Sequence, residues 1–116
     1  MSAEREIEIF ETNAFRKAFK KLSEAHKQLV EDEIDLIITN PERGKRKKGD
    51  LSYLWVHKFK LDNQLTLLGY SWNDRKLAIH LLNIAPHENF YREAKKRRKA
   101  DKNVISKRVG FGVTKA

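Results

Sequence analysis

Residues 51–84 read LSYLWVHKFKLDNQLTLLGYSWNDRKLAIHLLNI, and this stretch decides the fold. It contains three runs with the composition of β-strands, at about 51–60, 64–72 and 76–84. Two short separators divide the runs, Leu61-Asp62-Asn63 and Asn73-Asp74-Arg75, and both are rich in turn-forming residues. Links this short join antiparallel neighbours, so the stretch predicts a three-stranded meander.

Upstream of the meander, the sequence predicts a short strand and two helices. Residues 5–10 alternate weakly between isoleucine and glutamate, as a half-buried strand does. Thr12 or Asn13 is suited to cap a first helix, and Ser23 a second. Apolar residues repeat at helical spacing in both, until Asn40-Pro41 ends the second helix. We therefore expect two antiparallel helices joined by a tight turn.

Downstream, Pro86 breaks the last strand and residues 87–99 predict a short basic helix. The tail 101–116 is basic with scattered apolar residues, and a further strand, a surface arm and disorder all remain open for it. The predicted order is β-α-α-β-β-β-α. It corresponds to an α+β fold of two layers, an antiparallel sheet packed on a helical hairpin with its other face partly open. We expect a single domain over 1–100, followed by the basic C-terminal tail 101–116.

The charge is distributed unevenly along the 116 residues, whose net formal charge is +9. Residues 1–42 carry 6 basic and 10 acidic side chains, whereas residues 43–116 carry 19 basic and 6 acidic ones. This asymmetry favours an anionic partner for the second portion: a nucleic acid, a ribosome, an anionic membrane or an acidic protein. A well-solvated basic surface is the alternative.

Several classes of protein are excluded or disfavoured by what the sequence lacks. The absence of cysteine excludes disulfides, thiolate zinc sites and cysteine nucleophiles. The acidic N-terminus has no apolar run of the kind found in signal peptides, and no stretch approaches the length of a membrane span. The 4 histidines have neither HxH nor HxxxH spacing, so we expect no metal and no cofactor. Among them, His26 is predicted to face solvent and His80 to be a core residue.

Two groups of residues are candidates for chemistry. Period-two alternation places Lys58 and Lys60 on one face of their strand, and His57 on the other. The lysines form a cationic shelf for a phosphate or an acidic helix, although paired lysines are as typical of a solvated strand edge. After the last strand, His87 and Tyr91 are i, i+4 neighbours that offer an imidazole and a phenol, with a helix-start role as the alternative for His87.

Over roughly residues 5–97, the sequence resembles the RelE/ParE superfamily of bacterial toxins from type II toxin–antitoxin systems. The resemblance rests on the element order, the helix pair ending at Asn40-Pro41, the Gly- and Lys-rich loop after it (residues 42–50, here termed the basic loop), and the segments 51–61 and 87–92. It implies one of two activities. RelE-like members cleave mRNA in the ribosomal A site without a metal, by activating the ribose 2′-hydroxyl, and leave a cyclic phosphate. ParE-like members poison DNA gyrase. Both kinds are neutralised by a cognate antitoxin.

The resemblance also implies roles for individual residues. RelE carries two lysines at i, i+2 on the strand that matches Lys58 and Lys60. It also carries arginines on the next strand and after the last strand, where this chain has 64–68 and 84–86 without arginine. That departure weakens a strictly RelE-like catalysis. The YafQ group uses a histidine just after the last strand, the place of His87, and relatives keep an aromatic residue at the place of Tyr91.

We therefore expect a toxin that is a ribosome-dependent, metal-independent mRNA endonuclease and inhibits translation. A ParE-like gyrase inhibitor and a non-catalytic RNA-binding protein are the alternatives. We expect His87 to serve as general acid or base, with His57 as its partner if a bulge brings it to the same face. We expect Lys58 and Lys60 to stabilise the phosphorane, and Tyr91 to stack on or orient a nucleotide.

The expected partners are a cognate acidic antitoxin, in a possible toxin–antitoxin hetero-oligomer, and the 70S ribosome with its mRNA, without a membrane, in the cytoplasm. The residues expected to bind RNA or the ribosome share a positive charge and lie in the basic loop or the last helix. They are Arg43, Lys45, Arg46, Lys47, Lys48, Arg92, Lys95, Lys96, Arg97 and Arg98.

Overall fold

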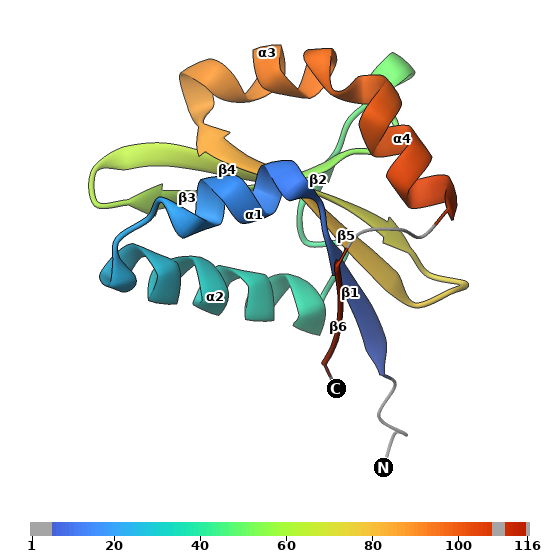
Figure 1. Ribbon diagram of the computed structural model, residues 1–116, viewed down its shortest axis with the longest axis horizontal. Helices are drawn as coiled ribbons and strands as arrows, with labels where there is room; N and C mark the ends of the chain where they lie inside the picture. The colour runs from blue at the N-terminus through green and yellow to red at the C-terminus, as the bar shows by residue number, and fades with distance from the viewer. Residues whose placement is uncertain (1–5, 108–110, 116) are drawn as a thin grey trace.

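The computed structural model describes residues 6–107 and 111–115, which form one six-stranded sheet with helices on both faces (Figure 1). The strand order across the sheet is β2-β3-β4-β5-β1-β6. The strands are β1 (Ile7–Glu11), β2 (Lys45–Arg46), β3 (Trp55–Leu61), β4 (Gln64–Asn73), β5 (Ala78–Pro86) and β6 (Phe111–Lys115). The helices are α1 (Asn13–Lys20), α2 (Glu24–Thr39), α3 (His87–Lys96) and α4 (Arg98–Lys107), with a short 3-10 turn at Gly49–Leu51.

The meander predicted over 51–84 is confirmed as β3, β4 and β5, which pair antiparallel in sequence order. The sheet as a whole is mixed, because β1 lies parallel beside β5 and β6 pairs antiparallel with β1. This arrangement places β5 inside the sheet. Its residues 78–84 are all buried, and a near-continuous apolar run is typical of a strand covered on both faces.

Side-chain caps start the first two helices where the sequence predicts them. The Thr12 hydroxyl accepts a hydrogen bond from the Phe15 N–H at 3.1 Å and donates one to the Leu82 carbonyl at 2.7 Å. Ser23 accepts from the His26 N–H at 3.1 Å. Each such cap is worth about 1 kcal/mol. Thr12 also ties the start of α1 to β5, so the helical hairpin is fixed at a defined place over the sheet.

The main core lies between the sheet and the α1–α2 hairpin. Phe15 of α1 and Val30 and Ile37 of α2 are almost fully buried against it. Burial of one such side chain contributes roughly 1.5–3 kcal/mol. The strand residues of this core are Ile9, Leu61, Leu68, Tyr70, Ile79, Leu81 and Ile84. The α+β class with a helical hairpin on the sheet is thereby confirmed.

The opposite face of the sheet, which we term the α3 face, is more covered than expected. Phe90 and Ala94 of α3 are buried there in a second cluster with Leu54, Val56, Leu67 and Leu82. Gly69 lets α3 approach, because a Cβ at this position would lie 2.6 Å from the Phe90 ring. Farther along, α4 contributes Ile105 to the same cluster.

The chain beyond the last strand contains more structure than one helix. The helix predicted over 87–99 is divided near Arg97 into α3 and α4, and β6 lies beside β1. The expected boundary at residue 100 falls within α4. Within residues 6–107 and 111–115, no helix combines the length and apolar character needed to cross a bilayer.

Candidate functional site

The two lysines of β3 lie on the α3 face of the sheet. Val56, two residues earlier on the strand, packs in the cluster around Phe90, and alternation places Lys58 and Lys60 on the same side. Both lysine side chains are exposed. Lys58 is aligned across the sheet with Leu67 of β4. The cationic shelf predicted from the sequence is therefore present.

A bulge in β5 turns the end of that strand toward the shelf. Gly69 pairs with Asn83 and Tyr70 with Leu81, which leaves Leu82 as an extra residue in β5. The alternation changes at this point. As a result Ala85 joins the Phe90 cluster and follows Lys58 and Leu67 in the same row across the sheet.

His87 and Tyr91 are held beside this row by α3. The helix begins at His87, directly after Pro86. Pro86 pairs with Thr66 of β4, and the residue before Thr66, Leu65, pairs with Lys60 of β3. The ring centroids of His87 and Tyr91 are 6.5 Å apart, edge to face. His87 is exposed, whereas Tyr91 is half-buried against Phe90. The structure therefore places Lys58 and Lys60 on the α3 face, and His87 and Tyr91 on the helix that packs against that face.

The basic loop reaches the same surface through a contact that the sequence did not reveal. Lys47 Nζ lies 5.0 Å from the centre of the Tyr91 ring. A cation at this distance over an aromatic face contributes about 0.5–1 kcal/mol at an exposed site. It positions the phenol and adds a positive charge next to it.

Tyr70 anchors the start of that loop from inside the core. Its hydroxyl donates to the Pro41 carbonyl at 2.6 Å and accepts from the Gly44 N–H at 3.1 Å. Burial raises the pKa of Tyr70 above its ordinary value of 10.0, so the phenol keeps its proton. The sequence carried no local signal for this contact, because Tyr70 lies 26 residues or more from both partners.

The remaining basic residues divide into exposed and paired ones. Arg43, Lys45 and Lys58 line a groove of about 360 Å³ at the free edge of β3. By contrast, Arg97 lies 3.6 Å from Asp101 and Arg98 lies 3.2 Å from Asp50, so part of their charge is already balanced. The exposed members of the predicted set are Arg43, Lys45, Arg46, Lys48, Arg92, Lys95 and Lys96.

The structure does not bring His57 to His87. The side chain of His57 points to the α1–α2 side, where its Nε2 lies 2.6 Å from Glu33 Oε1 of α2. It is 8% exposed and stacks on Phe59. Because β3 alternates without a bulge, no rotation of the side chain places this imidazole beside the lysines. Its contact with Glu33 instead joins α2 to the sheet.

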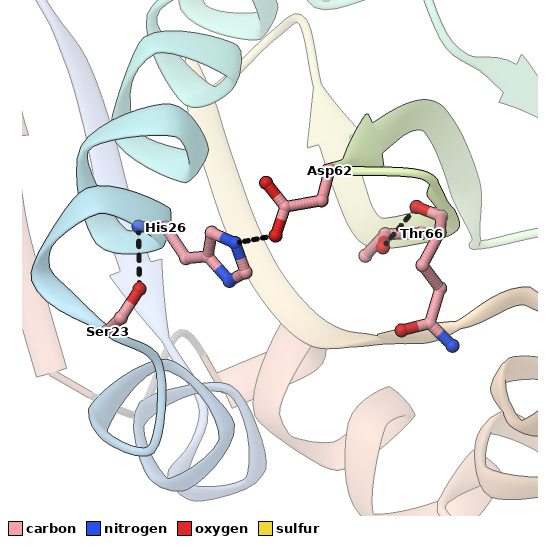
Figure 2. Close-up of polar contacts among 5 residues, drawn as sticks. Ser23, His26, Asp62 and Thr66 are labelled. Carbon is pink, nitrogen blue, oxygen red and sulfur yellow. Dashed lines mark hydrogen bonds and ion pairs between the residues drawn. The ribbon is translucent and has the colours of Figure 1, made fainter.

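Two other histidines also have defined surroundings. His80 is buried in a stack with Phe10 whose ring centroids are 4.8 Å apart, and burial lowers its pKa to about 4. The core role predicted for His80 is confirmed. His26 does not simply face solvent: it is half-buried, and Figure 2 shows it pointing toward Asp62, with Nε2 and Oδ2 2.9 Å apart.

One aromatic residue lies outside the strand predicted for it. Tyr53 precedes β3 and packs in the Phe90 cluster, with its hydroxyl shielded from solvent. Burial, and then the nearby Asp101 carboxylate, raise the pKa of Tyr53 to about 12. Within the described part of the chain, no group of three or more His, Cys, Asp or Glu residues is placed to hold a metal ion.

Comparison with known proteins identifies the family of the chain and relatives of its fold. Residues 9–95 match a sequence model of the ParE-like toxins of type II bacterial toxin–antitoxin systems. The chain belongs to this family, and so to the RelE/ParE superfamily of toxins. No curated protein matches its sequence.

Solved structures share the fold at low sequence identity. An arginine-to-alanine double mutant of the E. coli toxin RelE in the free state matches with a TM-score of 0.60 and 20% identity, over 77% of this chain and 94% of that one. The intact E. coli RelBE toxin–antitoxin complex matches with a TM-score of 0.55 and 16% identity, over 66% and 92% of the two chains. The archaeal RelE–RelB complex from Pyrococcus horikoshii matches with a TM-score of 0.50 and 21% identity, over 69% and 93%.

Proposed function

We propose that this toxin is a ribosome-dependent mRNA endonuclease that blocks translation without a metal ion. The observation that carries the proposal is the gathering of Lys58, Lys60, His87 and Tyr91 on the α3 face. An imidazole can move a proton and two cations can stabilise the developing charge when an internal nucleophile cleaves a phosphodiester, and an aromatic ring can hold a base. Around them, the basic loop offers positive charge to RNA phosphates.

The proposed reaction uses the RNA's own ribose as the nucleophile. The 2′-hydroxyl attacks the adjacent phosphorus, the bond from phosphorus to the 5′-oxygen breaks, and the products end in a 2′,3′-cyclic phosphate and a 5′-hydroxyl. His87 donates a proton to the leaving 5′-oxygen, while the proton of the 2′-hydroxyl passes to solvent. The ammonium groups of Lys58 and Lys60 neutralise the charge that gathers on the phosphorane. Tyr91 supplies a ring on which a base stacks.

The same proposal includes the partners. A cognate acidic antitoxin neutralises the toxin by covering the lysines and His87, in keeping with solved relatives that are complexes with the antitoxin RelB. The ribosome with its mRNA is the target, and the cytoplasm is accordingly the place of action. Both partners are anionic and meet the basic portion of the chain.

Inhibition of DNA gyrase is the second candidate. Two observations favour it. The matching family is described as ParE-like, and residues 64–68 and 84–86, which match the stretches where RelE carries arginines, contain no arginine. A gyrase inhibitor needs a binding surface and no acid–base group. The two functions therefore differ in whether toxicity requires the His87 imidazole.

Primer extension on mRNA that is being translated distinguishes the two functions. We expect cuts within the reading frame, with 2′,3′-cyclic phosphate ends, only when ribosomes are present. Addition of divalent metal beyond what the ribosome requires has no effect on the rate. Broken DNA with intact mRNA contradicts the nuclease proposal and supports the gyrase alternative.

His87→Ala is the decisive variant. Removal of one proton-transfer group lowers a rate typically by 10²–10⁴, so ribosome-dependent cleavage and growth arrest should both be lost. His87 is exposed at the start of α3, so the fold is retained. Glu88→Ala, next to it and also exposed, serves as the control. If the His87 variant remains fully toxic at matched expression, His87 only begins the helix.

A further inference from the structure

A groove at the end of the sheet away from the start of α3 has no role in the reaction described above (Figure 1). It has a volume of about 360 Å³, within the range of sites that bind small molecules. The start of β3, the end of β4, the turn after β4 and Ile105 of α4 contribute to its walls. Both tryptophans of the chain, Trp55 and Trp72, line it, and we term it the tryptophan groove.

The two indoles of this groove are held in place by the core and still reach solvent. Each is half-buried and packs against the main core. The Trp55 ring also stacks on the buried Tyr70 ring, with centroids 6.3 Å apart. Fixed and partly exposed aromatic surfaces of this kind are those on which unpaired bases stack.

Two guanidinium groups and two carboxylates surround the indoles. Arg46 and Arg75 line the groove together with Glu42 and Asp74, and all four side chains are exposed. The Arg46 Nε donates to the Ser52 carbonyl at 3.0 Å, which orients that guanidinium. Because the four formal charges balance, the lining does not concentrate anions. Donors beside acceptors instead match the edge of a nucleobase, which carries both.

Arg46 connects the tryptophan groove with the basic loop, since it belongs to both. The loop carries the positive charge that is proposed to meet RNA phosphates. Glu42 and Asp74 repel phosphates from the groove itself, whereas a base is uncharged. A single strand whose phosphates lie on the loop can therefore turn one base into the groove.

We infer that the tryptophan groove binds one unpaired base of single-stranded RNA, which stacks on an indole and is held at its edge by Arg46 and Arg75. This site goes beyond the proposed reaction, because it uses neither the two lysines of β3 nor His87. It gives the protein an affinity for RNA that does not require the ribosome.

The test is the quenching of tryptophan fluorescence by short RNA in the absence of ribosomes. The emission reports on the groove, because Trp55 and Trp72 are the only tryptophans of the chain and both line it. A uridine hexamer should quench the emission in a saturable way. An abasic hexamer with the same phosphates should bind roughly 5- to 150-fold more weakly, the range that one stacked base contributes, and should not quench.

Two neighbouring cations provide a matched pair of variants. Arg75→Gln removes a guanidinium from the groove, and Lys76→Gln removes a positive charge one residue away, outside the lining. Both side chains are exposed, so both proteins fold. Arg75→Gln should weaken binding of the uridine hexamer roughly 2- to 5-fold more than Lys76→Gln does, as expected for a cation at an exposed aromatic face. The anisotropy of a labelled hexamer measures both affinities.

The outcomes separate this inference from the proposed function. Equal affinity for the two hexamers, binding without quenching, or no binding of either hexamer overturns the inference. Equal losses in Arg75→Gln and Lys76→Gln overturn it as well. Cleavage of translated mRNA is scored in its own assay. Quenching without cleavage removes the endonuclease function and keeps the groove, and cleavage without quenching does the reverse.

Discussion

The position of the basic loop depends on a single oxygen atom, the hydroxyl of Tyr70. It is fully buried and bonds both Pro41 and Gly44, at the start of that loop. In Tyr70→Phe the Pro41 carbonyl and the Gly44 N–H lose this partner. A lost buried hydrogen-bond partner costs about 1–3 kcal/mol, so we expect the free energy of unfolding to fall by that amount.

Denaturant unfolding measures this change. Tyr91→Phe is the matched control, since its ring is only half-buried, and it should leave stability nearly unchanged. Equal stability of wild-type protein and Tyr70→Phe would show that solvent replaces both bonds. Affinity for ribosomes should also fall in Tyr70→Phe, because a looser loop orders its lysines at an entropic cost on binding.

At the scale of elements, the distance between α3 and the sheet is set by Gly69. A Cβ there would lie 2.6 Å from Phe90 and 3.0 Å from Leu54, both inside the packed cluster. Gly69→Ala must therefore displace α3, and overpacking of this kind typically costs about 1–3 kcal/mol. Because α3 carries His87 and Tyr91, we expect cleavage to fall by more than the loss of folded protein explains.

Thermal unfolding and a cleavage assay at a temperature where the variant is folded test this expectation together. A less stable Gly69→Ala protein with full activity per folded molecule would show that α3 moves without disturbing its first turn.

The helix α4 carries a buried carboxyl group with a consequence for pH. Asp101 is 3% exposed, and burial raises its pKa from 3.8 to about 6, although Arg97 opposes the change. Between about pH 4 and 6, Asp101 has lost its proton in the unfolded chain but still holds it in the folded protein. Its contribution to the free energy of unfolding therefore falls as pH rises through this range. His80 acts in the opposite direction, because its pKa falls from 6.5 to about 4 and the unfolded chain holds its proton longer.

The two effects partly cancel in the wild-type protein, and Asp101→Asn should separate them. We expect its free energy of unfolding to rise more steeply from pH 4 to 6.5 than that of the wild type. A pKa difference of about two corresponds to roughly 3 kcal/mol. Denaturant midpoints across this range are the measurement. Parallel curves for the two proteins would mean that Asp101 titrates normally.

At the scale of the whole molecule, local sequence patterns predicted the helices and strands. Contacts between residues far apart in the sequence determined the β5 bulge and the surroundings of individual side chains. Alternation placed Lys58 and Lys60 correctly, and capping residues placed α1 and α2, because these signals act within a few residues. The bulge at Leu82 depends on pairing with β4, and the bond from His26 to Asp62 spans 36 residues. Neither the bulge nor this bond produces a periodic pattern in the sequence. The contacts of the Tyr70 hydroxyl with the start of the basic loop produce no such pattern either.

The charge asymmetry is a property of the whole chain, and it predicts how binding responds to salt. Residues 43–116 carry a net charge of +13. Association with ribosomes should weaken steeply as salt increases, because each neutralised phosphate releases condensed counterions. A titration at several salt concentrations gives the slope. A shallow slope would mean that the basic loop does not touch RNA.

The last prediction concerns whether two partners share one surface. The proposed antitoxin inhibits by laying an acidic segment over the α3 face, where its carboxylates meet Lys58 and Lys60 and its apolar residues reach the sheet. Lys58→Glu/Lys60→Glu should therefore weaken ribosome-dependent cleavage and antitoxin affinity together. Both side chains are exposed, so the fold tolerates the change. Titration of each partner against this variant is the measurement. Unchanged antitoxin affinity with lost cleavage would show that inhibition acts from the α1–α2 side of the sheet.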